Sequence, residues 1–89
     1  MPCAIETTRR FRAAIKGWET EVTRILVEMQ HGFGDPHRHA GLGIRKLQSG
    51  VFECRAGLSL RLIFLARKGV LTFDFAGNHG QVKNYLRGL

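Results

Sequence analysis

Residues 51–66 read VFECRAGLSLRLIFLA, and this stretch decides the fold. Apolar residues recur at every second position on both sides of Gly57, which predicts two antiparallel β-strands joined by a tight turn. Arg55 and Arg61 interrupt the apolar pattern, although strands with two buried faces rarely hold charged side chains. Because successive side chains of a strand point to opposite faces of the sheet, the hairpin is expected to bury one face and to carry both arginines on the other.

The same alternation assigns the side chains of three central strands to two faces, with the third strand expected over residues 70–76. The face expected to meet the helices carries Phe52, Cys54, Leu60, Leu62, Phe64, Leu71, Phe73 and Phe75. The reverse face carries Glu53, Arg55, Arg61 and Asp74, joined in one register by Lys46. Opposite charges on neighbouring strands can pair, so an Arg61–Asp74 or Arg55–Glu53 ion pair is the alternative to an anion-binding role.

The remaining sequence surrounds this hairpin with further strands and with helices. Residues 43–48 continue the period of two, and residues 4–7 can form a short first strand. A first helix, capped by Thr7 or Thr8, is expected to bury Phe11, Ile15 and Trp18. A second helix is expected to bury an apolar stripe made of Trp18, Val22, Ile25, Leu26 and Met29. The segment HGFGDP, residues 31–36, ends the second helix because it holds two glycines and a proline.

Residues 81–89 predict a short C-terminal helix that packs through Val82, Tyr85 and Leu86. The expected fold is therefore α+β, with an N-terminal helical hairpin packed on a twisted three- to four-stranded antiparallel sheet. The chain has 89 residues, so residues 1–89 are expected to form a single domain.

Charge is distributed unevenly along the chain. Fourteen Lys and Arg residues stand against seven Asp and Glu, which gives a formal net charge of +7. Acidic and basic residues balance within residues 1–35, so the whole excess lies in residues 36–89, where the strands are expected. A concentrated basic field predicts an anionic partner, which can be nucleic acid, an acidic protein, or both.

Several functional classes lack their sequence signals. The chain contains no phosphate-binding loop, no GxGxxG motif and no Ser/His/Asp arrangement. Cys3 and Cys54 do not have metal-ligand spacing, and Cys54 is expected to be a small buried hydrophobe. The histidines His31, His37, His39 and His79 are not joined by cysteines or paired carboxylates, so they predict solvated side chains and no metal site.

No apolar run approaches the length of a membrane span, and the first twenty residues contain no apolar signal region. The sequence therefore predicts a cytoplasmic protein without a membrane partner, and it gives no reason to expect a cofactor. RRFR, residues 9–12, is interpreted as a solvated helix face.

One group of residues has chemistry that suits RNA cleavage. Lys46, Arg55 and Arg61 can hold a phosphate, and His79 can move a proton near neutral pH. RNA cleavage requires a base for the 2′-hydroxyl, positive charge for the phosphorane that develops, and an acid for the 5′-oxygen. None of these three requirements calls for a metal ion.

The order of these pieces resembles the RelE/ParE toxin superfamily of bacterial toxin–antitoxin systems. The resemblance spans residues 7–86 and is carried by GLGIRKLQSGVFECRAGLSLRLIF, residues 41–64, and by FAGNHGQV, residues 75–82. In these toxins a K-L segment and a glycine turn lead into a strand that ends in Arg. A strand with an Arg between apolar residues follows, and a last strand ends in a G-x-H type segment before a C-terminal helix.

This resemblance implies a microbial ribonuclease-like fold and a toxin that cleaves mRNA without a metal, in many members at the ribosome. Lys46 and Arg55 would contact or activate the scissile phosphate, Arg61 would stabilise its charge, and His79 would act as general acid. Further RNA contacts are expected from Arg45, Arg67, Lys68 and Lys83. Lys83 stands where other members have an aromatic residue. The implied partners are mRNA, the ribosome and an acidic antitoxin.

Two other functions remain open at the level of sequence. ParE-like members of the superfamily poison gyrase, and they generally lack the set formed by Lys46, Arg55 and His79. A non-catalytic member would bind RNA with steep salt dependence and leave it intact, or would bind a protein. The excess positive charge suits RNA and an acidic antitoxin equally well.

Overall fold

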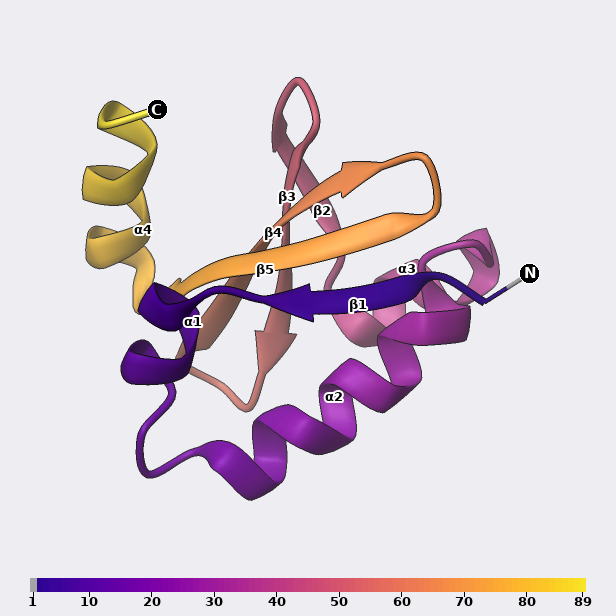
Figure 1. Ribbon diagram of the computed structural model, residues 1–89, viewed down its shortest axis with the longest axis horizontal. Coiled ribbons are helices and arrows are strands. Elements are labelled where there is room, and N and C mark those ends of the chain that lie inside the picture. Colours follow the sequence, from indigo (N-terminus) through magenta and orange to yellow (C-terminus); the bar gives the residue numbers. More distant parts are fainter. Residues whose placement is uncertain (1) are drawn as a thin grey trace.

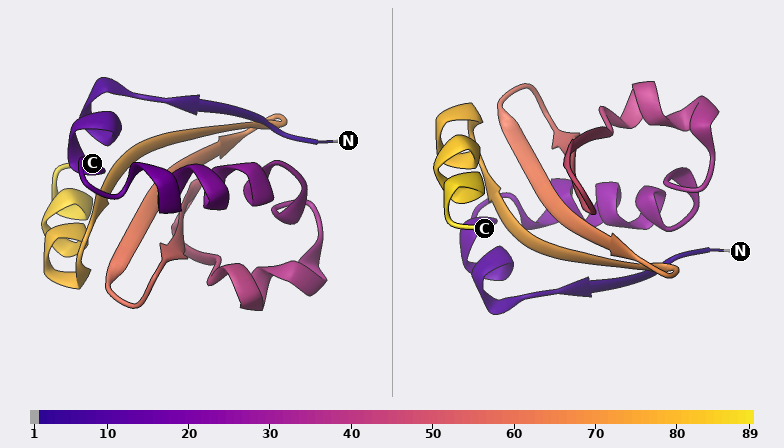
Figure 2. Two further views of the ribbon diagram at one scale, coloured as in Figure 1. Left: turned by 90° about the horizontal axis from the view of Figure 1, so that it is seen from below. Right: turned by 90° about the horizontal axis from the view of Figure 1, so that it is seen from above.

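The computed structural model describes residues 2–89 as a twisted sheet with helices at its ends and across one face (Figure 1). Its elements are β1 (Ala4–Thr7), α1 (Arg9–Ala14), α2 (Glu19–Gly32), α3 (Pro36–Leu42), β2 (Arg45–Gln48), β3 (Val51–Ala56), β4 (Leu60–Arg67), β5 (Val70–Gly77) and α4 (His79–Arg87). Figure 2 shows α4 at one end of the molecule and α3 at the other. No helix among residues 2–89 is both long and apolar enough to cross a membrane.

The sheet has five strands in the order β1-β5-β4-β3-β2. The strands from β2 to β5 form the antiparallel meander that the sequence predicts, with Val51 opposite Leu65 and Ala56 opposite Leu60 in the central pair. β1 lies parallel to β5 at the sheet edge. The expected α+β class is confirmed, whereas the expected three- to four-stranded antiparallel sheet is wrong because the strand at residues 4–7 joins it in parallel.

The main core lies between the sheet and the N-terminal helices. Phe11 of α1 packs 5.5 Å from Phe73 of β5, and Phe64 of β4 lies 4.9 Å from Phe73, measured between ring centroids. Cys54 is fully buried within this core, as expected. Burial raises the pKa of the Cys54 thiol to about 12, so this group stays protonated and behaves as a small hydrophobe.

The expected N-terminal hairpin of two helices is wrong, because three helices, α1, α2 and α3, precede β2 and Trp18 is not buried between the first two. Thr8 caps α1 by accepting a hydrogen bond from the Phe11 amide, and α1 ends before Ile15. α1 packs on β5, whereas α2 packs on β1 and β3. Trp18 belongs to neither buried stripe: it lies between the helices with 41% of its surface exposed, so its expected place in the core is wrong.

A third N-terminal helix, α3, begins at Pro36, directly after the segment that the sequence predicts only as the end of a helix. The Asp35 carboxylate accepts a hydrogen bond from the His37 amide, and Pro36 takes the first helical position. Both features favour a helix start, but the pattern of HGFGDP was interpreted only as a stop. The expected solvation of His39 is also wrong, because its Nε2 donates a hydrogen bond to the Phe33 carbonyl oxygen at 2.6 Å.

The reverse face of the sheet contains a second, smaller core beneath α4. A register shift places Ile63 opposite Phe75 and Phe64 opposite Phe73, so Asp74 is an extra residue in β5. Because such a bulge exchanges the faces of the residues that follow it, Phe75 points to the reverse face. The expected position of Phe75 beside Leu71 and Phe73 is therefore wrong.

This bulge anchors α4 to the sheet. Phe75 stacks on Tyr85 of α4 with 5.0 Å between ring centroids, and the Tyr85 hydroxyl donates a hydrogen bond to the Asp74 carboxylate at 2.7 Å. Arg10 of α1 lies 3.6 Å from the same carboxylate and 5.4 Å from the centre of the Tyr85 ring. Asp74 thus pairs with Arg10 and Tyr85, and the alternative Arg61–Asp74 pair is wrong.

Substituting Tyr85→Phe tests this anchor. Burial, followed by the hydrogen bond to Asp74, raises the pKa of Tyr85 above its ordinary value. A tyrosine in the unfolded chain has a pKa of about 10. The raised pKa of Tyr85 in the folded protein therefore contributes its full stabilisation below about pH 10, and this contribution is lost as the pH rises further. Tyr85→Phe should cost about 1 kcal/mol of unfolding free energy at pH ~8, and this difference should shrink toward pH ~11.

Urea unfolding of both proteins at the two pH values measures this difference. The comparison cancels the titration of lysines, which both proteins share. A difference that stays the same at both pH values would contradict the proposed anchor.

Candidate nucleic-acid interface

Three arginines share the reverse face of the sheet near its end. The strand register places Arg45 opposite Glu53 and Arg55 opposite Arg61. Directly opposed residues of antiparallel strands point to the same face. The two arginines of the central hairpin therefore lie side by side, as the alternation predicts, and Arg45 of β2 joins them.

Glu53 lies among these arginines and neutralises one of them. Its carboxylate accepts a hydrogen bond from the Arg61 guanidinium at 2.9 Å, and the two groups form an ion pair. Glu53 is 3% exposed. This pair differs from both expected alternatives, because Glu53 binds the arginine of the neighbouring strand and not Arg55. It holds Arg61 in a fixed position but reduces the charge that Arg61 offers to an anion.

Arg55 is exposed and has no ion pair within residues 2–89. Its side chain crosses the backbone of Gly43, which ends α3 with a φ of 66°. A Cβ atom at this position would lie 2.7 Å from Cγ of Arg55. Gly43 therefore meets two demands, since it adopts the left-handed conformation of a helix end and leaves room for Arg55.

The first turn of α4 begins directly beside the arginines. Arg61 lies opposite Gly77, and Asn78 caps the helix with a reciprocal pair of hydrogen bonds to Gln81 at 2.9 and 2.8 Å. His79 is the first residue of α4, whereas the sequence predicts that this helix starts at residue 81. Its exposed ring makes no hydrogen bond or ion pair with any residue from Pro2 to Leu89.

His79 and Lys83 lie one turn apart on the same flank of α4. Tyr85 occupies the opposite flank, where it meets Asp74 of β5 and Arg10 of α1. α4 packs on β5 and β4. It starts two residues after Gly77, which lies opposite Arg61, so His79 begins the helix at the end of the sheet that carries this arginine. We call Arg45, Arg55, Arg61, His79 and Lys83 the reverse-face cluster.

The other basic residues singled out by the sequence lie elsewhere. Lys46 is opposite Phe52, whose side chain belongs to the helix-covered face, so its expected place with Arg55 and Arg61 is wrong. Lys46, Arg67 and Lys68 together line a hollow of about 390 Å³ beside Phe33 and Phe52. The eight expected site residues thus divide into the reverse-face cluster and this distal cluster of three.

The reverse-face cluster has the groups needed to bind a phosphodiester. Guanidinium groups bind phosphate oxygens in a bidentate manner. The guanidinium of Arg55 has no ion pair among the described residues, whereas that of Arg61 is fixed by its ion pair with Glu53. The imidazole of His79 is a group that can donate or accept a proton in catalysis. Among the described residues, no group of three or more His, Cys, Asp or Glu side chains is arranged to hold a metal ion.

Sequence reasoning missed the Glu53–Arg61 pair of this site and the exposed position of Trp18 outside it. The Glu53–Arg61 pair had a signal, because the alternation already placed both residues on the reverse face. The position of Trp18 had none, since its spacing from Ile15 and Val22 fits a helix stripe.

Comparisons with known proteins identify the fold. No protein-family model matches the sequence, and no curated protein matches it. The structure is similar to the E. coli DinJ–YafQ toxin–antitoxin complex, with a TM-score of 0.72 and 15% identity over 92% of this chain and 98% of that chain. YafQ from E. coli gives a TM-score of 0.65 and 17% identity over 90% of this chain and 97% of that one.

The toxin–antitoxin complex RelBE2 from Mycobacterium tuberculosis gives a TM-score of 0.57 and 19% identity, and the match covers 89% of this chain and 100% of that chain. The chain therefore has the fold of the RelE/YafQ toxins, built on a five-stranded mixed sheet with N-terminal helices and a C-terminal helix. The expected resemblance is confirmed at the level of fold.

Substituting Glu53→Gln tests the buried ion pair. The amide cannot compensate the charge of Arg61, so the free energy of unfolding should fall by about 3 kcal/mol. Glu28→Gln on the exposed face of α2 is the control and should change it by less than about 0.5 kcal/mol. The double variant Glu53→Leu/Arg61→Met should recover most of the loss. A Glu53→Gln protein as stable as the control would contradict this role.

Proposed function

We propose that this protein is the toxin of a type II toxin–antitoxin system and that it is an endoribonuclease which cleaves mRNA. The observation that carries the proposal is that three arginines share one face of the sheet, beside the helix that carries His79 and Lys83, in a fold shared with YafQ and RelBE2. The net charge of +7 supports an RNA partner and equally an acidic antitoxin.

The proposed reaction uses the RNA's own 2′-hydroxyl as nucleophile. Attack on the neighbouring phosphorus forms a 2′,3′-cyclic phosphate and releases the 5′-oxygen, which takes up a proton. Arg55 and Arg61 stabilise the charge that develops on the phosphate oxygens. The 2′-hydroxyl loses its proton to water as it attacks, and His79, as general acid, donates a proton to the departing 5′-oxygen. Lys83 adds positive charge on the same flank of α4. This chemistry requires no metal, so cleavage should persist in EDTA.

The similar structures include the DinJ–YafQ toxin–antitoxin complex from E. coli and the RelBE2 toxin–antitoxin complex from Mycobacterium tuberculosis. We infer an acidic antitoxin as the protein partner here and the ribosome as the setting in which mRNA is cut. The distal cluster of Lys46, Arg67 and Lys68 remains a predicted contact for RNA or for that antitoxin.

A second candidate is a member of the fold that binds RNA or gyrase without cleaving RNA. Two observations favour it: Arg61 is neutralised by Glu53, and no side chain of residues 2–89 orients the ring of His79. An assay of gyrase supercoiling beside the cleavage assay distinguishes the two candidates.

Cleavage of an mRNA with and without ribosomes tests the proposal. Arg55→Ala and His79→Ala should each reduce the rate by about 100-fold, because each removes charge stabilisation or proton transfer in the transition state. Circular dichroism should show that both variants remain folded, since both side chains are exposed.

Arg45→Ala and Lys46→Ala form a matched pair, because these adjacent cations point to opposite faces of β2. Arg45→Ala should weaken RNA binding, and Lys46→Ala should have a much smaller effect. Wild-type protein that leaves mRNA intact under both conditions, or an intact rate in His79→Ala, would overturn the nuclease assignment.

A further inference from the structure

Trp18 is the only tryptophan of the chain, and 41% of its surface is exposed. It lies in the connection between α1 and α2, where it precedes Glu19, the first residue of α2. A domain with so small a core would gain stability by burying its largest side chain. The exposed indole therefore calls for an explanation outside the core.

Trp18 lies at the end of the sheet where the β3–β4 turn joins the strands of Arg55 and Arg61. Glu21, three residues further along the chain, has a carboxylate oxygen only 3.1 Å from where a Cβ of Gly57 would lie. Gly57 follows β3 in the β3–β4 turn, two residues after Arg55 and four before Arg61. The start of α2 thus lies at the same end of the sheet as the arginines and the first turn of α4.

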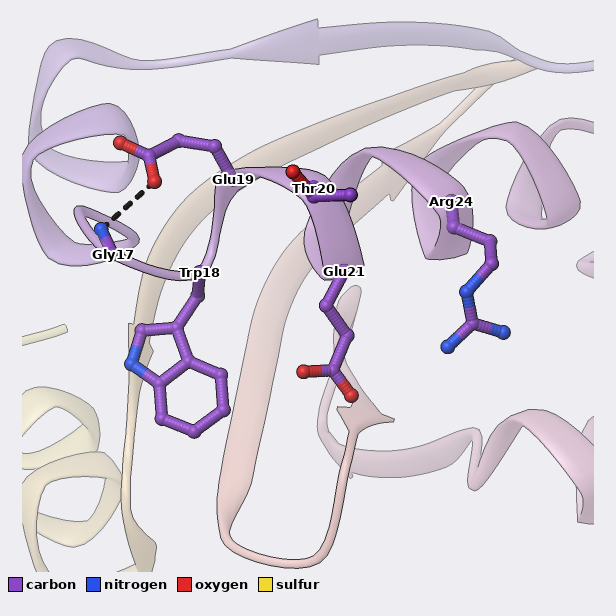
Figure 3. Close-up of a pocket in the computed structure, with 6 residues that line it drawn as sticks. All are labelled: Gly17, Trp18, Glu19, Thr20, Glu21 and Arg24. Carbon is purple, nitrogen blue, oxygen red and sulfur yellow. Dashed lines mark hydrogen bonds between the residues drawn. The ribbon is translucent and has the colours of Figure 1, made fainter.

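Figure 3 shows the direction of the side chain. The indole projects away from the backbone of α2 into the space between α4 and the β3–β4 turn. Trp18 and Glu21 line a hollow of about 500 Å³ together with Gly17, Glu19, Thr20 and Arg24. The indole nitrogen forms no hydrogen bond with any residue of the described chain, 2–89, so it can donate one to a ligand.

The backbone around Trp18 is held in place. The Trp18 amide donates to the Ile15 carbonyl at 2.8 Å, and the Trp18 carbonyl accepts from the Val22 amide at 2.9 Å. The Glu19 carboxylate accepts a hydrogen bond from the Gly17 amide at 2.8 Å. A fixed backbone lowers the conformational entropy that the aromatic ring would lose on binding a ligand.

We propose that Trp18 is a stacking platform for a base of single-stranded RNA, at the end of the sheet that carries the arginines which bind its phosphate. This inference rests on the proposed function and adds the strandedness of the substrate. Aromatic rings stack on unpaired bases, which a duplex does not offer. Glu19 and Glu21 repel phosphates from the hollow, so the neutral base lies over Trp18 while the backbone turns toward Arg55 and Arg61.

Tryptophan fluorescence tests the proposal directly because it reports on Trp18 alone. A short single-stranded RNA with 2′-O-methyl groups, which cannot be cleaved, should quench the emission in a saturable manner. The duplex form of the same RNA should quench it far less. Binding of the labelled RNA is followed separately by fluorescence anisotropy, which does not depend on Trp18.

Trp18→Ala should weaken single-strand binding by about tenfold, the usual worth of one stacked base, and Trp18→Phe should retain most of the affinity. Val27→Ala is the control, since Val27 is an exposed apolar residue of α2 outside the hollow. Unfolding in urea confirms that each variant is folded.

The outcomes separate this inference from the proposed function. If anisotropy shows that the wild-type protein binds no RNA, the proposed function fails and takes this inference with it. If the wild-type protein binds and cleaves RNA while its emission is unchanged and Trp18→Ala binds equally well, only the stacking role is overturned. Equal quenching by poly-glutamate would also overturn it, because a polyanion without bases cannot stack.

Discussion

The single extra residue in β5 is the constraint on which the rest of this structure depends. Without the bulge at Asp74, Phe75 would enter the main core and the reverse face would lose its aromatic contact with α4. The bulge also aims the Asp74 carboxylate at the Tyr85 hydroxyl and at Arg10. Thr8, the cap of α1, donates to the Asp74 carbonyl at 3.3 Å and thereby connects α1 to the same point. The position of α4 follows from these contacts.

The position of α4 in turn creates the candidate site. Two of its residues, His79 and Lys83, lie one turn apart on the helix that the Tyr85–Asp74 contact fixes to β5. The arginines come from the meander, in which one face is buried beneath the N-terminal helices and the other is covered only in part, by α4. The site is thus shared between two independent parts of the fold. The buried Glu53–Arg61 pair lowers the charge of the site and fixes the orientation of one guanidinium.

The sequence predicted the parts of the fold that depend on local pattern. The hairpin at residues 51–66, the short strand at 4–7 and the Thr8 cap are confirmed because their signals are alternation and capping chemistry. Three features could not be predicted from the sequence, because each depends on how distant segments are arranged. They are the parallel pairing of β1, the bulge at Asp74 and the exposure of Trp18. The alternation of side chains along the strands predicted that Arg55 and Arg61 share one face. The separation of Lys46 from them could not be predicted in this way, because it depends on the register of β2 against β3.

The central claim is that RNA binds the reverse face of the sheet, and an NMR titration tests it most directly. Backbone amide shifts are recorded while a non-cleavable single-stranded RNA is added. The account predicts that the largest changes occur at Arg45, Arg55, Arg61, His79 and Lys83. Large changes confined to Lys46, Arg67 and Lys68, with the reverse face unchanged, would contradict it.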